Sequence, residues 1–232
     1  MNVAPQAFSW LEQSSHDLPV GNDWLSPLEV QLLDRLHFPK RRADWRLGRW
    51  TAKRAVSAHL DLPPGPDMLA AIDILPAVSG APEVYLFGRP APVTISVSHS
   101  GGAGFCAVAG PGVALGCDVE TVEPRSPAFL ADYFTVEEQS LVVHTAPAER
   151  DRLLTLLWSA KESVLKALRS GLRSDTRWVN VTPLGQASSP ASPGSWWPLH
   201  ARHISGRVLH GWWRETAGFV WTVVAEPLPL RG

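Results

Sequence analysis

The sequence lacks a charge excess of either sign and lacks long apolar runs. Its 21 lysines and arginines nearly balance 22 acidic residues, which leaves a net charge of −1. General nucleic-acid binders and membrane-surface binders carry a clear basic excess, so this balance argues against both classes. No apolar run reaches the roughly 18 residues that span a bilayer. We therefore expect neither a nucleic-acid partner nor a membrane partner.

Cysteine is scarce as well. The chain has two, Cys106 and Cys117, in short apolar stretches without a CxxC motif or a histidine cluster. Buried, reduced thiols fit this pattern better than a disulfide or a metal site. The opening residues, MNVAPQAFSWLEQ, show neither the basic start nor the apolar segment of an export signal. These features predict a cytoplasmic protein.

What the chain does contain is typical of a globular protein. Hydrophobic residues make up 45% and charged residues 19% of its 232 positions. A chain of this length can bury a core in one large domain or in two smaller ones. The 11 tryptophans most simply fill such cores.

Helix signals occur in both halves of the chain. Ser26-Pro27 combines a serine N-cap with proline at the first helical position, and residues 41–60 form a longer helix. The stretch 135–138 matches a capping box. The strongest helix runs from Pro147 to Gly171, a favourable C′ residue.

Strand signals follow each long helix. The first 25 residues show no clear period and are expected to be irregular. β-branched or apolar runs bounded by glycine or proline predict strands. These runs are 93–100, 104–110 and 113–120, and a terminal hairpin covers 210–227. The expected fold class is therefore α+β.

Two short patterns occur twice in the same order. WTAKRAV at 50–56 matches WSAKESV at 158–164, and GFCAVAG at 104–110 matches the strand that begins at Gly218. Two matches in register favour a duplicated α+β unit with a seam near 110–115. We expect two similar halves, residues 1–112 and 113–232, packed as a pseudo-dimer around one cleft where ligands bind.

The segment GCDVE places two carboxylates two residues apart. On a strand, Asp118 and Glu120 point to the same face. Like charges side by side repel, and a Mg²⁺ ion held by both carboxylates and by phosphate oxygens would relieve that repulsion. An exposed acidic strand face is the simpler alternative, and it stays open at this point.

Three further features carry charge or flexibility. In SHSGG, Ser98 and His99 precede glycines that let a backbone approach a phosphate, although a plain turn with a surface histidine fits too. Glu162 and Lys166 share one helix face as an i, i+4 pair, which is also a common surface ion pair. Lys161 lies beside them.

A basic helix stands out in this neutral chain. Arg42, Arg46 and Arg49 are spaced for roughly one helix face. This face is either solvated or a site for a polyanionic small molecule.

Taken together and in this order, these features resemble the Sfp-type 4′-phosphopantetheinyl transferases. The basic helix is followed by SHSG at 98–101, by GCDVE at 116–120 and by WSAKESVLKA at 158–167. The last two motifs carry most of the resemblance, which extends from Arg41 to Gly171. Members of that family are built from two similar α+β halves.

The resemblance implies a reaction and its substrates. Such enzymes move the 4′-phosphopantetheine group of coenzyme A to a serine of an apo acyl or peptidyl carrier protein, and they release adenosine 3′,5′-bisphosphate. Mg²⁺ bridges protein carboxylates and the pyrophosphate. Polyketide, nonribosomal-peptide and fatty-acid carriers all remain open as partners. The chain length implies a monomer rather than a trimer.

The resemblance also implies roles for particular residues. Asp118, Glu120 and Glu162 would hold the metal, and Glu162 or a hydroxide on the metal would accept the serine proton. Ser98 and His99 would contact coenzyme A phosphates, and Lys166 and Lys161 would neutralise the pyrophosphate. Arg42 and Arg49 would hold the nucleotide phosphates.

One departure from the family pattern concerns a lysine. The family commonly has Gly-Lys-Pro upstream of the SHS segment, whereas this chain has Gly80-Ala81-Pro82. Either Arg89 supplies the missing cation or one phosphate contact is lost. The alternative function is that of a non-catalytic homologue, which would only bind coenzyme A or a carrier protein. A different Mg²⁺-dependent enzyme would need its own set of carboxylates, and the sequence does not show one.

Overall fold

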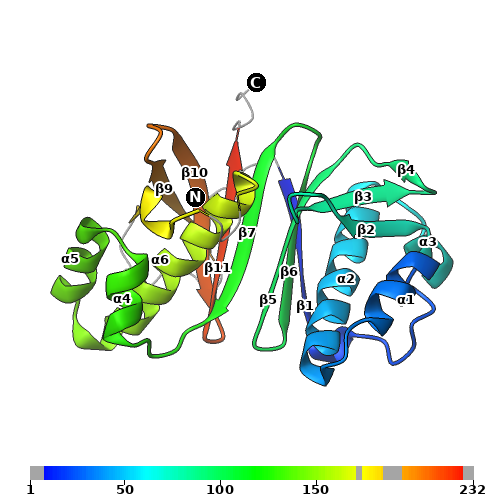
Figure 1. The fold of residues 1–232 in the computed structure, drawn as a ribbon, viewed down its shortest axis with the longest axis horizontal. Coiled ribbons are helices and arrows are strands. Elements are labelled where there is room, and N and C mark those ends of the chain that lie inside the picture. The colour runs from blue at the N-terminus through cyan, green and yellow to red at the C-terminus, as the bar shows by residue number, and fades with distance from the viewer. Residues whose placement is uncertain (1–7, 171–173, 185–194, 227–232) are drawn as a thin grey trace.

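The computed structural model describes residues 8–170, 174–184 and 195–226 and has the α+β fold that the sequence predicts (Figure 1). Its first half contains three helices and six strands in the described residues. They are β1 (Phe8–Ser14), α1 (Pro27–Asp34), α2 (Pro39–His59), α3 (Pro66–Ala70), β2 (Ile72–Pro76), β3 (Pro82–Leu86), β4 (Arg89–Pro90), β5 (Thr94–Ser100) and β6 (Ala103–Ala109).

The second half holds the remaining described helices and strands. They are β7 (Ala114–Thr121), α4 (Pro127–Tyr133), α5 (Val136–His144), α6 (Pro147–Ala167), β8 (Val179–Pro183), β9 (Trp197–His203), β10 (Val208–Thr216) and β11 (Phe219–Glu226). Short 3₁₀ helices cover Ser15–Asp17 and Thr176–Trp178. Within the described residues, no helix has both the length and the apolar character needed to cross a membrane.

The strands form three antiparallel sheets. The order is β1-β6-β5 in one sheet, β2-β3-β4 in a second and β7-β11-β10-β9-β8 in the third. All strands of the first two sheets precede Gly110, and all strands of the third follow Val113. In Figure 1, β5, β6 and β7 lie together at the centre, with α2 on one side and α6 on the other.

Helices α2 and α6 are built alike. Each has 21 residues and begins with proline at its first position, where the fixed φ of proline suits a helix start. The helix that precedes each one begins with a capping box, Ser26 with Glu29 before α2 and Thr135 with Glu138 before α6. The repeated sequence patterns therefore correspond to repeated structure.

Three apolar clusters hold the layers together. One lies under α2 and another under α6, and the third fills the space between the two central sheets. Strand β6 serves two of these clusters, because Cys106 and Val108 face α2 while Phe105 and Ala107 face the other sheet. Aromatic rings, among them Phe105 and Trp221 with centroids 5.2 Å apart, fill the third cluster.

Glycine lets each long helix approach its sheet. A Cβ on Gly116 would lie 1.8 Å from the backbone oxygen of Ser163, and one on Gly104 would lie 2.4 Å from Oγ1 of Thr51. No other residue type fits at Gly116 without moving α6. This glycine therefore sets the distance between α6 and β7.

Several elements differ from the sequence prediction. The first 25 residues contain a strand, β1, which pairs with β6 and in which Phe8 alone is fully buried. Helix α2 begins at Pro39 rather than at residue 41. Helix α4 and strands β8 and β9 were not predicted, and Gly171 lies outside the described residues.

Candidate functional site

Strands β5 and β7 belong to different sheets and are joined by serine side chains. Ser96 Oγ accepts a hydrogen bond from the backbone N–H of Cys117 at 2.9 Å. Ser98 Oγ donates to Asp118 Oδ1 at 2.6 Å, and Ser100 Oγ donates to Glu120 Oε2 at 3.3 Å. The two halves of the chain therefore meet along alternate residues of β5, with both predicted carboxylates at this junction.

Asp118 is at the centre of the junction and is only 3% exposed. Besides Ser98, its Oδ1 accepts a hydrogen bond from Lys166 Nζ at 2.8 Å. Lys166 also donates to the backbone oxygen of Cys117 at 3.0 Å. Oδ2 of Asp118 is buried and has no hydrogen-bond partner among the described residues. One carboxylate oxygen is thus held firmly, and the other can take a ligand.

A tryptophan of α6 holds Glu120 of β7. Its Oε1 accepts a hydrogen bond from Trp158 Nε1 at 3.2 Å, and Oε2 lies 3.8 Å from Arg125. Burial raises the pKa of Glu120, and the neighbouring charge of Asp118 raises it further. Neither Trp158 nor Arg125 was predicted as a site residue. Trp158 is the tryptophan of the repeated WSAK pattern, which was the available signal.

Glu162 approaches from α6. Its Oε1 is buried and has no hydrogen-bond partner among the described residues. Burial is the main reason that its pKa is raised to about 7. Lys166 opposes this shift, and the charges of Asp118 and Glu120 add to it. The three carboxylates thus act on one another electrostatically.

The donor set fits a magnesium ion in its chemistry. Carboxylate oxygens are the ligands that Mg²⁺ prefers, and two of them, on Asp118 and Glu162, are buried without partners. In the part of the chain that the structure describes, no three histidine, cysteine or acidic side chains already stand close enough to form a metal site. Lys166 supplies the positive charge beside Asp118 instead.

His99 is the second-last residue of β5 and lies on the side that faces α2. A Cβ on Gly48 of α2 would lie 3.5 Å from Cδ2 of the His99 ring. Desolvation lowers the pKa of His99; Asp44 opposes this effect and Lys166 adds to it. His99 is exposed as a residue, and the charge of Lys166 at the carboxylate junction acts on its ring.

Arg42 and Arg49 bind groups within their own half. Arg42 Nη1 donates to the backbone oxygens of Leu33 and Leu36, at 2.6 and 3.1 Å, and so satisfies carbonyls at the end of α1. Arg49 Nε lies 3.8 Å from Glu29, and its guanidinium stacks over the Trp45 ring. Among the described contacts, neither arginine reaches the carboxylate junction.

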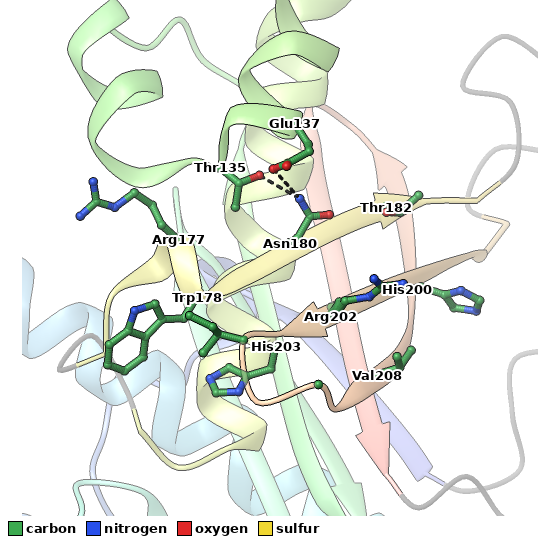
Figure 2. A pocket seen from close by; sticks show the side chains of 13 residues that line it. Thr135, Glu137, Arg177, Trp178, Asn180, Thr182, His200, Arg202, His203 and Val208 are labelled. Atoms are coloured by element: carbon green, nitrogen blue, oxygen red, sulfur yellow. Dashed lines mark hydrogen bonds between the residues drawn. The ribbon is translucent and has the colours of Figure 1, made fainter.

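Of two cavities in the described residues, the smaller one adjoins the site. One of about 260 Å³ adjoins the junction and is lined in part by Ala81, Ser96 and Lys166. A larger hollow of about 630 Å³ lies over β8 and β9 (Figure 2). None of the predicted site residues lines it. Arg89 is exposed on β4 and does not line the smaller cavity, whereas Ala81 does.

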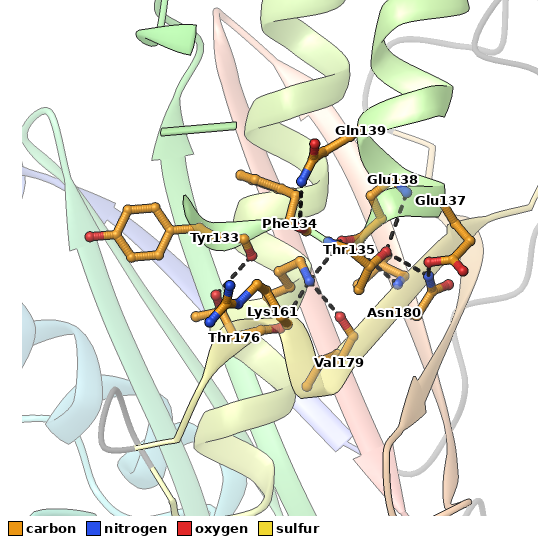
Figure 3. Close-up of polar contacts among 12 residues, drawn as sticks. Tyr133, Phe134, Thr135, Glu137, Glu138, Gln139, Lys161, Thr176, Val179 and Asn180 are labelled. Atoms are coloured by element: carbon orange, nitrogen blue, oxygen red, sulfur yellow. Dashed lines mark hydrogen bonds and ion pairs between the residues drawn. The ribbon is translucent and has the colours of Figure 1, made fainter. Parts of the chain in front are cut away.

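Lys161 lies in the core, away from the junction. Its side chain is fully buried, and its Nζ forms an ion pair with Glu138 at 2.7 Å (Figure 3). It also donates to the backbone oxygens of Thr176, at 2.9 Å, and Val179. The predicted place of Lys161 at the pyrophosphate is wrong, because every donor of this ammonium points into the protein.

The first half contains the counterpart of this arrangement. Lys53 is fully buried, forms an ion pair with Glu29 and donates to the backbone oxygens of Trp24 and Leu69. Glu29 and Glu138 each accept a hydrogen bond from a strand as well, from Ile74 in one half and Val181 in the other. The lysine shared by both WxAK patterns is therefore a structural residue.

The comparisons with known proteins point to one family. Residues 114–222 match the family model of the 4′-phosphopantetheinyl transferase superfamily, ACPS. Among curated proteins, no match to the chain is found.

Solved structures that are similar to the chain include holo-(acyl-carrier-protein) synthases. The Bacillus anthracis enzyme, in complex with CoA (3′,5′-ADP), has 19% identity and a TM-score of 0.37, with 44% of this chain and 92% of that chain covered. The Helicobacter pylori enzyme, in complex with coenzyme A, has 19% identity and a TM-score of 0.31, with 44% and 98% covered. The Plasmodium yoelii enzyme has 13% identity and a TM-score of 0.36, with 46% and 94% covered.

The matched segment is the part of the chain that carries the junction. It contains Asp118, Glu120, Glu162 and Lys166, together with Trp158 that binds Glu120. The recurrence of helix and strand in both halves agrees with the family resemblance seen in the motifs. Residues 114–222, just under half of the chain, are therefore similar to the 4′-phosphopantetheinyl transferase superfamily.

Proposed function

We propose that the protein transfers the 4′-phosphopantetheine group of coenzyme A to a serine of an apo carrier protein. Adenosine 3′,5′-bisphosphate is the second product. The observation that carries this proposal is the pair of buried, unpartnered carboxylate oxygens on Asp118 and Glu162 beside the ammonium of Lys166. Such a site suits a substrate that carries phosphate groups and binds together with a divalent cation.

Asp118, Glu120 and Glu162 are the residues that would hold Mg²⁺. The bound ion would neutralise charge on the transferred phosphoryl group, which is the main requirement of phosphoryl transfer. Ser98 and Ser100 orient two of these carboxylates through their hydroxyl groups. Ser98 is thus better suited to positioning Asp118 than to direct contact with a phosphate.

Lys166 is the proposed partner of the coenzyme A diphosphate. Its ammonium already lies at the junction, where a second anion would share it with Asp118. His99 is the second proposed phosphate contact, since its ring is exposed and lies beside α2. We propose no phosphate contact for Lys161, Arg42 or Arg49, because each binds groups of its own half.

The reaction needs a proton acceptor for the incoming serine. The serine oxygen would attack the pantetheine-side phosphorus, and the bond from that phosphorus to the bridging oxygen would break. The leaving group keeps the bridging oxygen, and the hydroxyl proton passes to a carboxylate. Glu162 is the proposed acceptor, because it lies on α6 beside Lys166 with a buried carboxylate oxygen that no described residue binds.

The two halves, residues 1–112 and 113–232, are proposed as a pseudo-dimer within one chain. The matching helices α2 and α6, and the matching ion pairs of Lys53 and Lys161, support that reading. The site then needs no second copy, and the protein acts as a monomer. We also propose that the protein acts in the cytoplasm.

A direct transfer assay tests the function. The protein is incubated with coenzyme A, Mg²⁺ and apo acyl, peptidyl and aryl carrier proteins, and the carriers are analysed by mass spectrometry. We expect a gain of one phosphopantetheine on at least one carrier, and no gain on a carrier whose acceptor serine is replaced by alanine. Coenzyme A binding without any transfer would support the non-catalytic alternative instead.

A further inference from the structure

The cavity of about 260 Å³ beside the junction carries two cations. Lys166 and Arg169 are the charged side chains among the described residues that line it, and no acidic side chain does so. Both come from the C-terminal end of α6 or the residues that follow it. The remaining wall includes Gly80 and Ala81 from the β2–β3 turn and Leu115 from β7. The cavity is therefore positive and lies between the two halves.

The two cations differ in their partners. Lys166 is held by Asp118 and the backbone oxygen of Cys117. The Arg169 side chain is exposed, and its guanidinium forms no ion pair or hydrogen bond with the described residues. The cavity thus contains a cation without an internal counter-charge, and an anionic group from outside the protein would satisfy it.

The backbone at Arg169 adds a second, independent observation. Its φ is +54°, in the left-handed region that follows many helix ends. Glycine adopts this conformation with less strain than any residue that carries a Cβ. The chain instead has an arginine there, and this arginine lines the same cavity as Ala81 and Lys166. Glycine would suit the backbone at this position better, so we attribute the presence of arginine to its charged side chain.

We propose that Arg169 is a substrate-binding residue that contacts a phosphate group of coenzyme A. This inference rests on the proposed function. Arg169 and Lys166 line the same cavity, so one extended polyphosphate ligand can contact both. Guanidinium groups bind phosphate through paired, charge-assisted hydrogen bonds, which fits a ligand with three phosphate groups.

Replacing Arg169 with glycine separates binding from folding. Arg169→Gly removes the side chain and relieves the backbone, so the melting temperature should be unchanged or higher. We expect a Kd for coenzyme A about tenfold weaker by titration calorimetry, the loss of one charge-assisted contact. In the transfer assay KM for coenzyme A should rise, with kcat nearly unchanged. Arg169→Lys should recover part of the affinity.

The matched control is Arg202→Ala, which removes an exposed arginine from the distant hollow over β9. It should leave coenzyme A affinity unchanged; an equal loss in this variant would show a general charge effect and overturn the proposal. Titration with 3′-dephospho-coenzyme A identifies the contacted group. If Arg169→Gly still loses affinity for this ligand, the contact is the diphosphate, and if the loss disappears, it is the 3′-phosphate.

Two results distinguish failure of this inference from failure of the proposed function. If the wild-type protein transfers phosphopantetheine and Arg169→Gly binds coenzyme A as tightly as the wild type, only the role of Arg169 is refuted. If the wild-type protein neither binds coenzyme A nor modifies any carrier, the proposed function fails and the role of Arg169 fails with it.

Discussion

A Cβ atom on Gly116 would lie 1.8 Å from the backbone oxygen of Ser163. Strand β7 and helix α6 therefore touch backbone to backbone, directly beside the strand position of Asp118 and the helix positions of Glu162 and Lys166. The distance between the two elements, and with it the geometry of the junction, depends on the absence of one side chain.

Gly116→Ala should therefore displace α6 and destabilise the protein. Overpacking of this kind costs about 3 kcal/mol, measurable as a drop in the urea midpoint. Gly110→Ala is the matched control, since a Cβ there meets no atom within 4 Å and its φ is not in the left-handed region. Equal stability of the two variants would show that α6 does not rest on Gly116 as described.

Lys166→Met should remove most of the transfer activity. The ammonium is the cation at the junction, and loss of one well-placed electrostatic contact lowers kcat by about 10²–10³-fold. The Lys166 side chain is 28% exposed, so methionine fits in size, but the buried Asp118 loses its cation and the melting temperature should fall. Circular dichroism checks the fold, and steady-state kinetics check the rate. An unchanged kcat would remove Lys166 from the proposed chemistry.

Glu162→Gln should change stability and activity in opposite directions. The carboxylate is desolvated and lies among other acids, so the neutral amide should raise the melting temperature in metal-free buffer. Mg²⁺ should then raise the melting temperature of the wild type more than that of the variant, since a ligand that binds only the folded state stabilises it. Transfer should fall below detection. A variant that responds to Mg²⁺ as strongly as the wild type would contradict the metal role of Glu162.

Lys161→Met and Lys53→Met should behave as a pair. Each breaks a fully buried ion pair and leaves Glu138 or Glu29 without its cation, which costs about 3–5 kcal/mol. Calorimetry should show similar losses for both, because the two sites are built alike. The folded fraction of either variant should keep the wild-type KM for coenzyme A. A specific rise in KM for Lys161→Met would restore this lysine to the phosphate site.

The pKa of Asp175 gives a prediction for acid pH. Hydrogen bonds from the Arg177 side chain and backbone lower it from 3.8 to about 2. A lowered carboxyl pKa in the folded state adds stability above the unfolded pKa, and that stability is lost as pH falls from about 4 towards 2. NMR titration should give a midpoint of about 2 for Asp175. In Arg177→Ala the midpoint should move up towards the ordinary value; no movement would contradict the assigned cause.

Much of the fold was predictable where local signals were strong. Capping or proline patterns mark the beginnings of three helices, at Ser26, Thr135 and Pro147. β-branched or apolar runs mark the central strands and the terminal hairpin. Strand β1 was missed because most of its residues are half-buried on both sides, so no alternation marks it. Its residues pair with residues of β6 that lie 89 to 101 positions away, a tertiary contact that no local window contains.

The site was predictable in part for a similar reason. The strand period correctly placed Asp118 and Glu120 on one side of β7, facing the serines of β5. Helix spacing could not show that Lys161 faces the core, since a lysine in an amphipathic helix is usually solvated. The buried Glu138 that holds it is 23 positions away and on another helix. The repetition of that lysine at position 53 was the better guide to its role.

The duplicated framework also determines how many active sites one chain can have. A two-fold scaffold offers two equivalent places, and 108 positions before Glu162 and Lys166 the chain has Arg54 and Ala58. The second place therefore lacks both the carboxylate and the ammonium of the first. On the proposed function, each chain binds one coenzyme A, with a saturation curve that is simply hyperbolic. The proposed pseudo-dimer therefore predicts no cooperativity between two coenzyme A sites within one chain.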